Sequence, residues 1–193
     1  MSELLVNTIK KADGTGSITV PADSGTLLTS VSDIPAGNLT GALPITDMDQ
    51  WYLNTNLSVA NSGLTYLQNM SQETDLLIGT GMSESSGVFT FPSNGYWQVA
   101  WNWNGPTASA SPRIEPTIEI STNSGSSYSA AGFANSTFYA AGWNGGTLLR
   151  TYRITAYAST RIRFGYFSSG GSFTAWNSNN YNAINFRKVG AYD

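Results

Sequence analysis

The sequence contains no cysteine and no histidine among its 193 residues. Without cysteine there is no disulfide, no thiolate nucleophile and no cysteine-bound zinc. Without histidine the usual general base near neutral pH is missing, which excludes Ser/His/Asp and Cys/His catalytic sites. Stability must therefore come from packing or from association between copies.

Charge is scarce too, because Asp, Glu, Lys and Arg make up 11% of the chain, against roughly 25% in a typical soluble domain. The net charge of −3 leaves no basic stripe for a phosphate backbone, so we expect no nucleic-acid partner. Four arginines alternate with apolar residues, which predicts the solvated face of strands: Arg150, Arg153, Arg161 and Arg163.

Long hydrophobic runs are missing, and none approaches the roughly 20 residues of a membrane span. The opening MSELLVNTIKK lacks the basic-then-apolar order of a secretory signal, so we expect synthesis in a host cytoplasm. The glycine-rich SSGGS at 168–172 has no lysine after it and no helix, unlike a phosphate-binding loop. We expect no cofactor and no metal.

The carboxylates do not form a convincing catalytic pair. Glu115 and Glu119 share a predicted strand face, but four residues at ~3.3 Å each separate them by roughly 13 Å. A glycosidase pair lies about 5–9.5 Å apart. Asp47 and Asp49 would be nearer, at roughly 7 Å on the same strand spacing, but we interpret them as solvated charges of a linker. The sequence predicts a protein that is not an enzyme.

Composition changes at Trp51. Residues 1–50 contain no aromatic side chain, whereas every Trp, Tyr and Phe lies in 51–193. We expect an extended, β-poor N-terminal arm over 1–50 and a separate domain over 51–193. The apolar side chains of the arm need a partner surface, which is either further copies of itself or a larger particle. Those expected to anchor it are Leu4, Leu5, Val6, Ile9, Ile18, Val20, Leu27 and Leu28.

The sequence of residues 51–193 indicates an all-β domain, because short runs of alternating apolar and polar residues are broken by Gly, Asn and Ser. One apolar and one polar face per strand indicates an antiparallel sandwich. Strands are predicted at 75–80, 87–91, 96–103, 114–122, 137–141, 147–158, 161–167 and 181–189. In 96–103, the side chains of Trp97, Trp101 and Trp103 fall on one face and that of Tyr96 on the other.

The stretch GVFTFPSNGYWQVAWNW, 87–103, resembles the second conserved block of C1q/TNF-like jelly rolls. The matching positions are Gly87, Phe89, Pro92, Gly95 and Tyr96. IEISTNSGSSYSA, TLLRTYRITAYASTRIRFGYFS and SNNYNAINFRKVG resemble later blocks of that fold in the same order, so the likeness covers about 51–190. No collagen-like stalk and no acidic calcium cluster accompany it.

The resemblance implies a jelly-roll homotrimer packed through an aromatic-rich sheet face. Three placements of the tryptophan stripe follow: the core of the sandwich, with Tyr96 facing neighbouring subunits; the trimer axis; or a sugar-stacking platform. The residues assigned to trimer interface or core are Phe89, Tyr96, Trp97, Trp101, Trp103 and Phe186.

The N-terminal phrases LLVNTIKKADGTGSITVPADSGTLLT and IPAGNLTGALP resemble openings of structural proteins from tailed bacteriophages, notably of marine and cyanobacterial hosts. This resemblance implies a virion surface protein whose arm binds other virion proteins. Because no long shaft separates arm and domain, we expect a capsid decoration or head fibre.

The alternative is a tail-fibre tip or adhesin that binds a host surface glycan or protein, with receptor contacts in two loops at Trp143, Asn144, Trp176 and Asn177. A secreted C1q-like ligand is a third interpretation, against which the missing signal and stalk argue.

Overall fold

The computed structural model describes residues 8–10, 17–19, 45–107, 113–134, 136–137, 141–178 and 181–191. The chain divides into two units, Met1–Pro44 and Ile45–Asp193. In the first, β1 (Thr8–Lys10) and β2 (Ser17–Thr19) pair antiparallel with Ile9 opposite Ile18. The remaining expected anchor residues lie outside the described residues: Leu4, Leu5, Val6, Val20, Leu27 and Leu28.

The second unit, called the head below, begins at Ile45 and includes β3 (Met48–Leu53). The expected division between 50 and 51 therefore falls inside a strand. Aromatic composition changes at Trp51, but the strand starts earlier because Met48 and Asp49 already pair with β16 (Ala183–Gly190).

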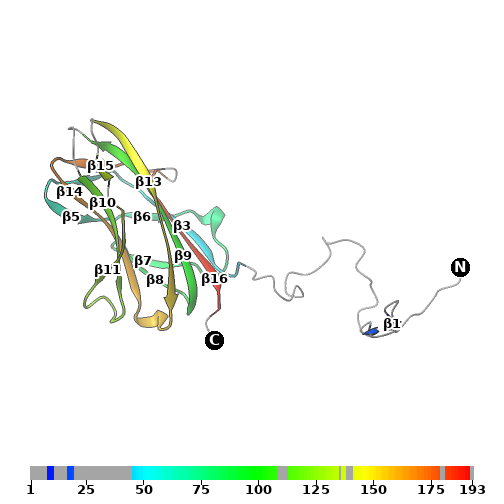
Figure 1. Ribbon diagram of the computed structural model, residues 1–193. Coiled ribbons are helices and arrows are strands. Elements are labelled where there is room, and N and C mark those ends of the chain that lie inside the picture. Colours follow the sequence, from blue (N-terminus) through cyan, green and yellow to red (C-terminus); the bar gives the residue numbers. More distant parts are fainter. Residues whose placement is uncertain are drawn as a thin grey trace, which may run out of the picture. The chain divides into compact units, whose positions relative to one another are not determined.

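Two antiparallel sheets face each other in the head (Figure 1). The β10/β14 sheet has the order β11 (Ser129–Phe133), β10 (Arg113–Ser121), β14 (Arg161–Ser169), β8 (Val88–Thr90) and β7 (Ser83–Ser85), with β12 (Ser136–Thr137) also on β10 and β5 (Gly63–Tyr66) on β14. The β9/β16 sheet has the order β4 (Leu57–Val59), β15 (Phe173–Ala175), β9 (Gly95–Thr107), β16, β3 and β6 (Met70–Gln72), with β13 (Gly142–Ile154) also on β9. The predicted antiparallel all-β sandwich is confirmed.

Two predicted strands differ from the structure. Instead of a strand at 75–80, the 3-10 helix η3 spans Thr74–Leu76 and a turn follows, in which Gly79 takes positive φ. The strand expected at 147–158 starts earlier, at Gly142, and gives way after Ile154 to the 3-10 helix η4 (Tyr157–Ser159). The predicted strand at 137–141 lies mostly outside the described residues.

The tryptophan stripe lies in the core. Trp97 and Trp101 are fully buried and Trp103 is 3% exposed. Trp101 packs against Phe164 and Tyr166 of the opposite sheet, with ring centroids 5.5 and 4.8 Å away. Phe89 and Phe186 are fully buried as well, and their ring centroids lie 5.2 Å apart. Because β9 alternates strictly, this burial turns Tyr96, 40% exposed, to the outside of the sheet.

Candidate functional site: an exposed aromatic cluster

Three large aromatic side chains meet on the surface of the head: Trp143, Trp176 and Tyr181, called the aromatic cluster below. Their exposed fractions are 53%, 37% and 42%. The indole centroids lie 4.6 Å apart at an interplanar angle of 70°, and the Trp143 and Tyr181 rings lie 5.8 Å apart at 44°. Sequence reasoning named both tryptophans but missed Tyr181, which it placed in the closing strand. That strand, β16, begins two residues later at Ala183.

Trp143 lies in β13, opposite Pro106 of β9, and not in a loop as expected for the stretch AGWNGG (141–146). Gly145 and Gly146 serve close packing, whereas a Cβ on Gly142 would meet nothing within 4 Å. A Cβ on Gly146 would meet the Trp103 indole at 3.2 Å. Gly146 therefore faces the core, so alternation along the strand turns Trp143 to the outer face and Asn144 to the inner one. Trp143 and Asn144, both expected as receptor contacts, therefore lie on opposite faces of β13, and their role in binding stays a prediction. Asn144 Nδ2 donates to the carbonyl of Gly142 at 3.0 Å.

Asn182 fixes the main chain on which Trp176 and Tyr181 sit. It is fully buried, and its Nδ2 donates to the carbonyls of Asn104 at 2.8 Å and Trp176 at 2.6 Å. The Tyr166 hydroxyl donates to Asn182 Oδ1. Burial raises the pKa of Tyr166 well above its ordinary value, which keeps this hydroxyl protonated as the donor.

Asn177 holds the other side of the same turn. Its backbone N–H donates to Asn56 Oδ1 at 2.8 Å and its Nδ2 to the carbonyl of Asn54 at 3.2 Å. Asn177 is exposed and adjoins Trp176, as expected, but its amide also has this structural role. The ring positions are thus set by hydrogen bonds from two neighbouring segments.

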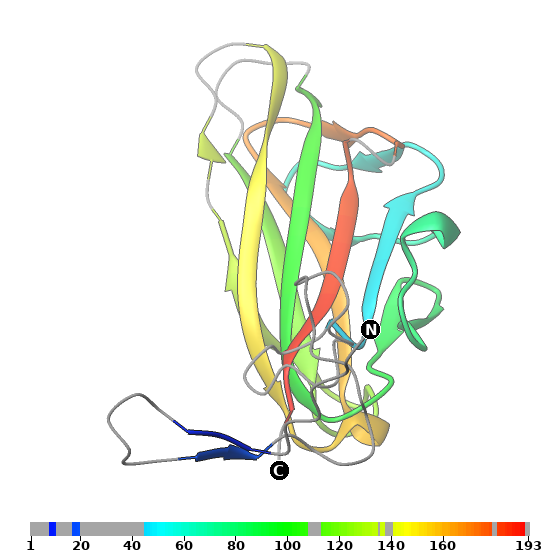
Figure 2. The same ribbon diagram turned by 90° about the vertical axis from the view of Figure 1, so that its right-hand side faces the viewer.

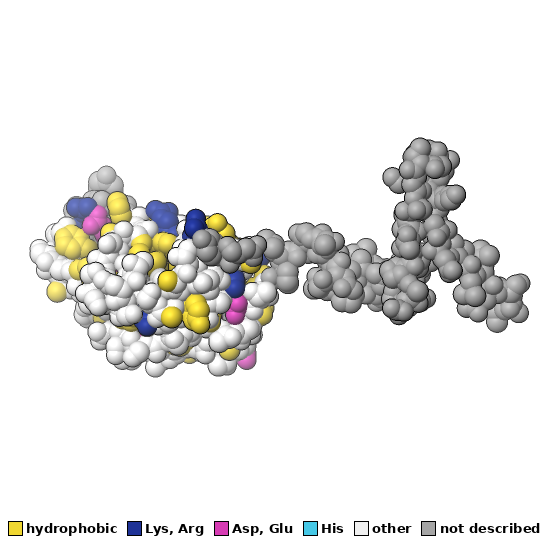
Figure 3. Space-filling view, turned by 90° about the horizontal axis from the view of Figure 1, so that it is seen from below, with side chains coloured by type: hydrophobic (Ala, Val, Ile, Leu, Met, Phe, Trp, Pro, Cys, Tyr) yellow, Lys and Arg dark blue, Asp and Glu magenta, His cyan; other side chains and the backbone are white. Residues whose placement is uncertain are grey.

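The chain segments that carry the cluster or bond to them are uncharged. The segments 54–63, 102–107, 141–149, 171–178 and 181–186 contain no Asp, Glu, Lys or Arg, but several asparagines. A few charged side chains appear on the face of the head shown in Figure 3.

The cluster lies at the end of the β9/β16 sheet opposite to the start of the head. In the pairing of β16 with β3, Ala183 lies opposite Tyr52, whereas Arg187 lies opposite Met48, three residues after Ile45. Tyr181 precedes Ala183 and is therefore at the far end. β13 runs from Trp143 at that end to Ile154, opposite Gly95, at the other, and the long strands lie side by side in Figure 2.

The outer face of the same sheet has little charge along β9 and β13. Along β9 and β13, Ala100 lies opposite Leu149 and Asn102 opposite Thr147, with Tyr96 opposite Arg153 at one end. Leu149 is 50% exposed. Among the described strands β13 pairs only with β9, so its second edge is unpaired over a long strand. Natural proteins usually cover or charge such an edge.

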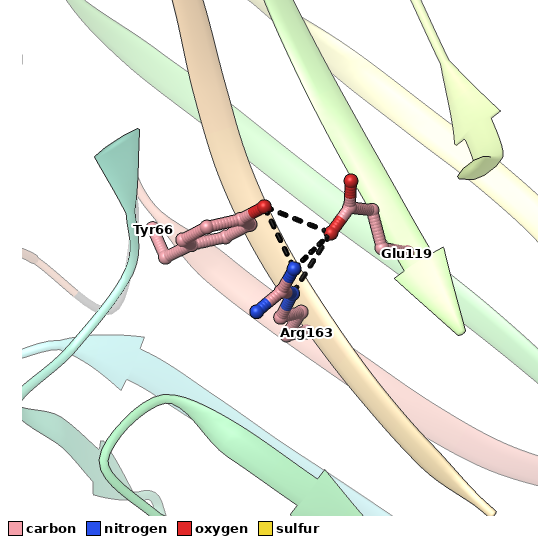
Figure 4. A network of polar contacts seen from close by, with 3 residues as sticks. All are labelled: Tyr66, Glu119 and Arg163. Atoms are coloured by element: carbon pink, nitrogen blue, oxygen red, sulfur yellow. Dashed lines mark hydrogen bonds and ion pairs between the residues drawn. The ribbon is translucent and has the colours of Figure 1, made fainter. Parts of the chain in front are cut away.

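Two arginine–glutamate pairs lie on the other sheet. Arg163 lies between the rings of Tyr66 and Tyr128, 3.9 and 3.8 Å from their centroids, and its Nε donates to Glu119 at 2.8 Å (Figure 4). Tyr66 also donates to Glu119, and burial together with this hydrogen bond raises its pKa. Glu115 pairs with the exposed Arg113.

Asp49 was predicted to be a solvated charge, but its side chain is fully buried. Its carboxylate accepts hydrogen bonds from Trp51 Nε1 at 2.6 Å, Gln72 Nε2 at 3.0 Å and the backbone N–H of Met82 at 2.7 Å. These donors satisfy the charge, because buried carboxylates require such partners.

Comparison with solved structures identifies the fold. Murine APRIL, crystallised at pH 5.0, aligns with a TM-score of 0.57 at 8% identity over 74% of this chain and 98% of its own. The Eiger TNF of S. frugiperda aligns with a TM-score of 0.56 at 10% identity over 76% and 94%. The fold is a TNF-like jelly roll.

PRD1 vertex protein P5 aligns over 75% of this chain and 98% of its own at 13% identity, with a lower TM-score of 0.46. No protein-family model matches the sequence, and no curated protein does. Within the described part of the jelly roll, no helix is long and apolar enough to cross a membrane.

Proposed function

We propose that this protein is a non-enzymatic surface protein of a bacteriophage virion. It is a homotrimer whose N-terminal segment attaches to other virion proteins and whose jelly-roll head faces outward. One observation carries the proposal: the head begins at one end of the β9/β16 sheet, and its exposed aromatic cluster lies at the opposite end. An attachment through the start of the head would be at the end of the sheet that does not carry the cluster.

Self-association is supported by the outer face of the β9/β16 sheet. Leu149 and Tyr96 are exposed on a face that holds few charges, beside the unpaired edge of β13. Packing three such faces around an axis buries the apolar side chains and covers the edge, which closes the assembly. The TNF-like fold agrees with this arrangement.

The place on the particle is proposed to be the capsid, as a decoration or head fibre. The second candidate is a tail-fibre tip that binds the host surface, and the aromatic cluster favours it, because exposed grouped aromatic rings are typical of binding surfaces.

Immunogold electron microscopy tests the proposal on phage particles, with antibody against the head (residues 85–190). Label over the capsid supports the decoration or head fibre, and label at the tail supports the adhesin. Particles that carry no label would overturn the virion role. As a control, particles assembled with a chain lacking residues 1–44 should lose the label, because the anchor is gone.

A further inference from the structure

We infer that the aromatic cluster binds the uncharged pyranose rings of a glycan. The inference concerns the head alone and holds wherever the particle carries it. It starts from exposure: Trp143, Trp176 and Tyr181 keep large apolar surfaces in water at one place, while the tryptophans of β9 are buried. Grouped exposure of this kind marks a binding surface rather than the single exposed apolar residues that are normal on proteins.

The ring geometry suits a sugar. At an interplanar angle of 70° the two indoles form a corner instead of a stack, so each keeps a face that the other does not cover. The face of an aromatic ring is electron-rich. It attracts the weakly positive C–H groups that line one side of a pyranose. Asparagine amides supply both donors and acceptors for hydroxyl groups, and Asn177 is exposed beside Trp176.

The cluster is held in place before any ligand arrives. Asn182 binds the carbonyl of Trp176 from inside the head, and Asn56 binds the N–H of Asn177 from the surface. Because the main chain under the rings is already ordered, binding costs little conformational entropy.

Charge decides the class of glycan. The segments that carry the cluster or bond to them hold no cation to pair with sialic acid, sulfate or phosphate, and no anion for an amino sugar. Anionic groups are normally recognised by arginine or lysine. The surroundings therefore favour neutral hexoses and N-acetylhexosamines.

The test uses the full chain against an array of neutral hexose and N-acetylhexosamine oligosaccharides, with sialylated and sulfated oligosaccharides as charged probes. We expect binding to at least one neutral probe and to no charged one. In titration calorimetry with that probe, Trp143→Ala and Trp176→Ala should each weaken binding by about tenfold or more, on the scale of a lost ring-stacking contact. Phe133→Ala and Tyr157→Ala are the matched controls, since both side chains are exposed aromatics outside the cluster, and they should leave affinity unchanged.

Absence of binding to every neutral probe would overturn the inference, as would unchanged affinity in both tryptophan variants. Thermal melting and sedimentation of each variant separate loss of the site from loss of the fold. A change of oligomeric state in Trp143→Ala or Trp176→Ala would assign the cluster to a contact between copies and also overturn the inference. Because the measurement uses purified protein, its outcome is independent of whether particles carry the immunogold label.

Discussion

The side-chain amide of Asn182 donates to the carbonyl of Trp176 at 2.6 Å from a fully buried position. The same nitrogen reaches the carbonyl of Asn104, so one residue joins β9, the segment after β15 and the start of β16. The surface aromatic cluster therefore depends on a side chain that no ligand can touch.

Replacing Asn182 by alanine should lower the free energy of unfolding by about 2–4 kcal/mol, because buried carbonyls and the Tyr166 hydroxyl lose their partner. Urea unfolding measures this. Asn61→Ala, in an exposed turn, is the control and should change stability by no more than about 0.5 kcal/mol. A stability loss no larger than that of the control would show that water replaces the lost bonds.

The half-buried ion pair of Arg163 and Glu119 should show measurable coupling. In a double-mutant cycle with Arg163→Met and Glu119→Gln we expect an interaction free energy on the order of 1–2 kcal/mol, because two tyrosine rings shield the pair from water. The exposed Arg113–Glu115 pair, tested with Arg113→Met and Glu115→Gln, should give less than about 0.5 kcal/mol. Equal coupling in the two cycles would contradict the role of burial.

Gly87 cannot accept a side chain. It has a φ of +81°, and a Cβ there would lie 1.8 Å from the carbonyl oxygen of Leu67. Gly87→Ala should therefore cost on the order of 3–4 kcal/mol, among the largest effects of a single substitution. Gly63, where a Cβ has nothing within 4 Å, is the matched control. Chemical denaturation of Gly87→Ala and Gly63→Ala measures the difference in stability. Similar unfolding midpoints in the two variants would disprove the clash.

Tyr152 should make the protein sensitive to alkali. Burial raises the pKa of its hydroxyl to about 12, above the ordinary value of 10.0. The stability it contributes is present below pH 10 and is lost as the pH rises toward 12, since the unfolded chain ionises first. Urea unfolding between pH 9 and 12 should show a shallower decline for Tyr152→Phe than for the wild type. An unchanged slope would mean that another group causes the decline.

The proposed trimer gives a further prediction. Leu149→Arg should place three cations in an apolar contact, which is costly without partners, and weaken association by about tenfold or more. Sedimentation velocity across a dilution series measures this. Leu64→Arg is the control, because Leu64 is exposed on β5 of the other sheet. A trimer that persists in Leu149→Arg would exclude this face as the interface.

The sequence by itself determined the strands with strict alternation. The parity of Trp97, Trp101 and Trp103 placed them on one face of β9, because successive side chains of a strand point to opposite faces whatever its partners are. The likeness to TNF-like jelly rolls rested on the same local signals. The loop expected at Trp143 and Asn144 is a strand, in which Gly145 and Gly146 pack against Trp103.

Only the tertiary structure decided the candidate site. Trp143, Trp176 and Tyr181 come from segments that lie apart in the sequence and meet because β13 pairs with β9 while Asn182 holds the chain beside it. The burial of Asp49 likewise depends on donors up to 33 residues away. Such long-range contacts depend on the packing of whole sheets, so no short stretch of sequence predicts them. The alternation of a strand, in contrast, can be recognised from consecutive residues.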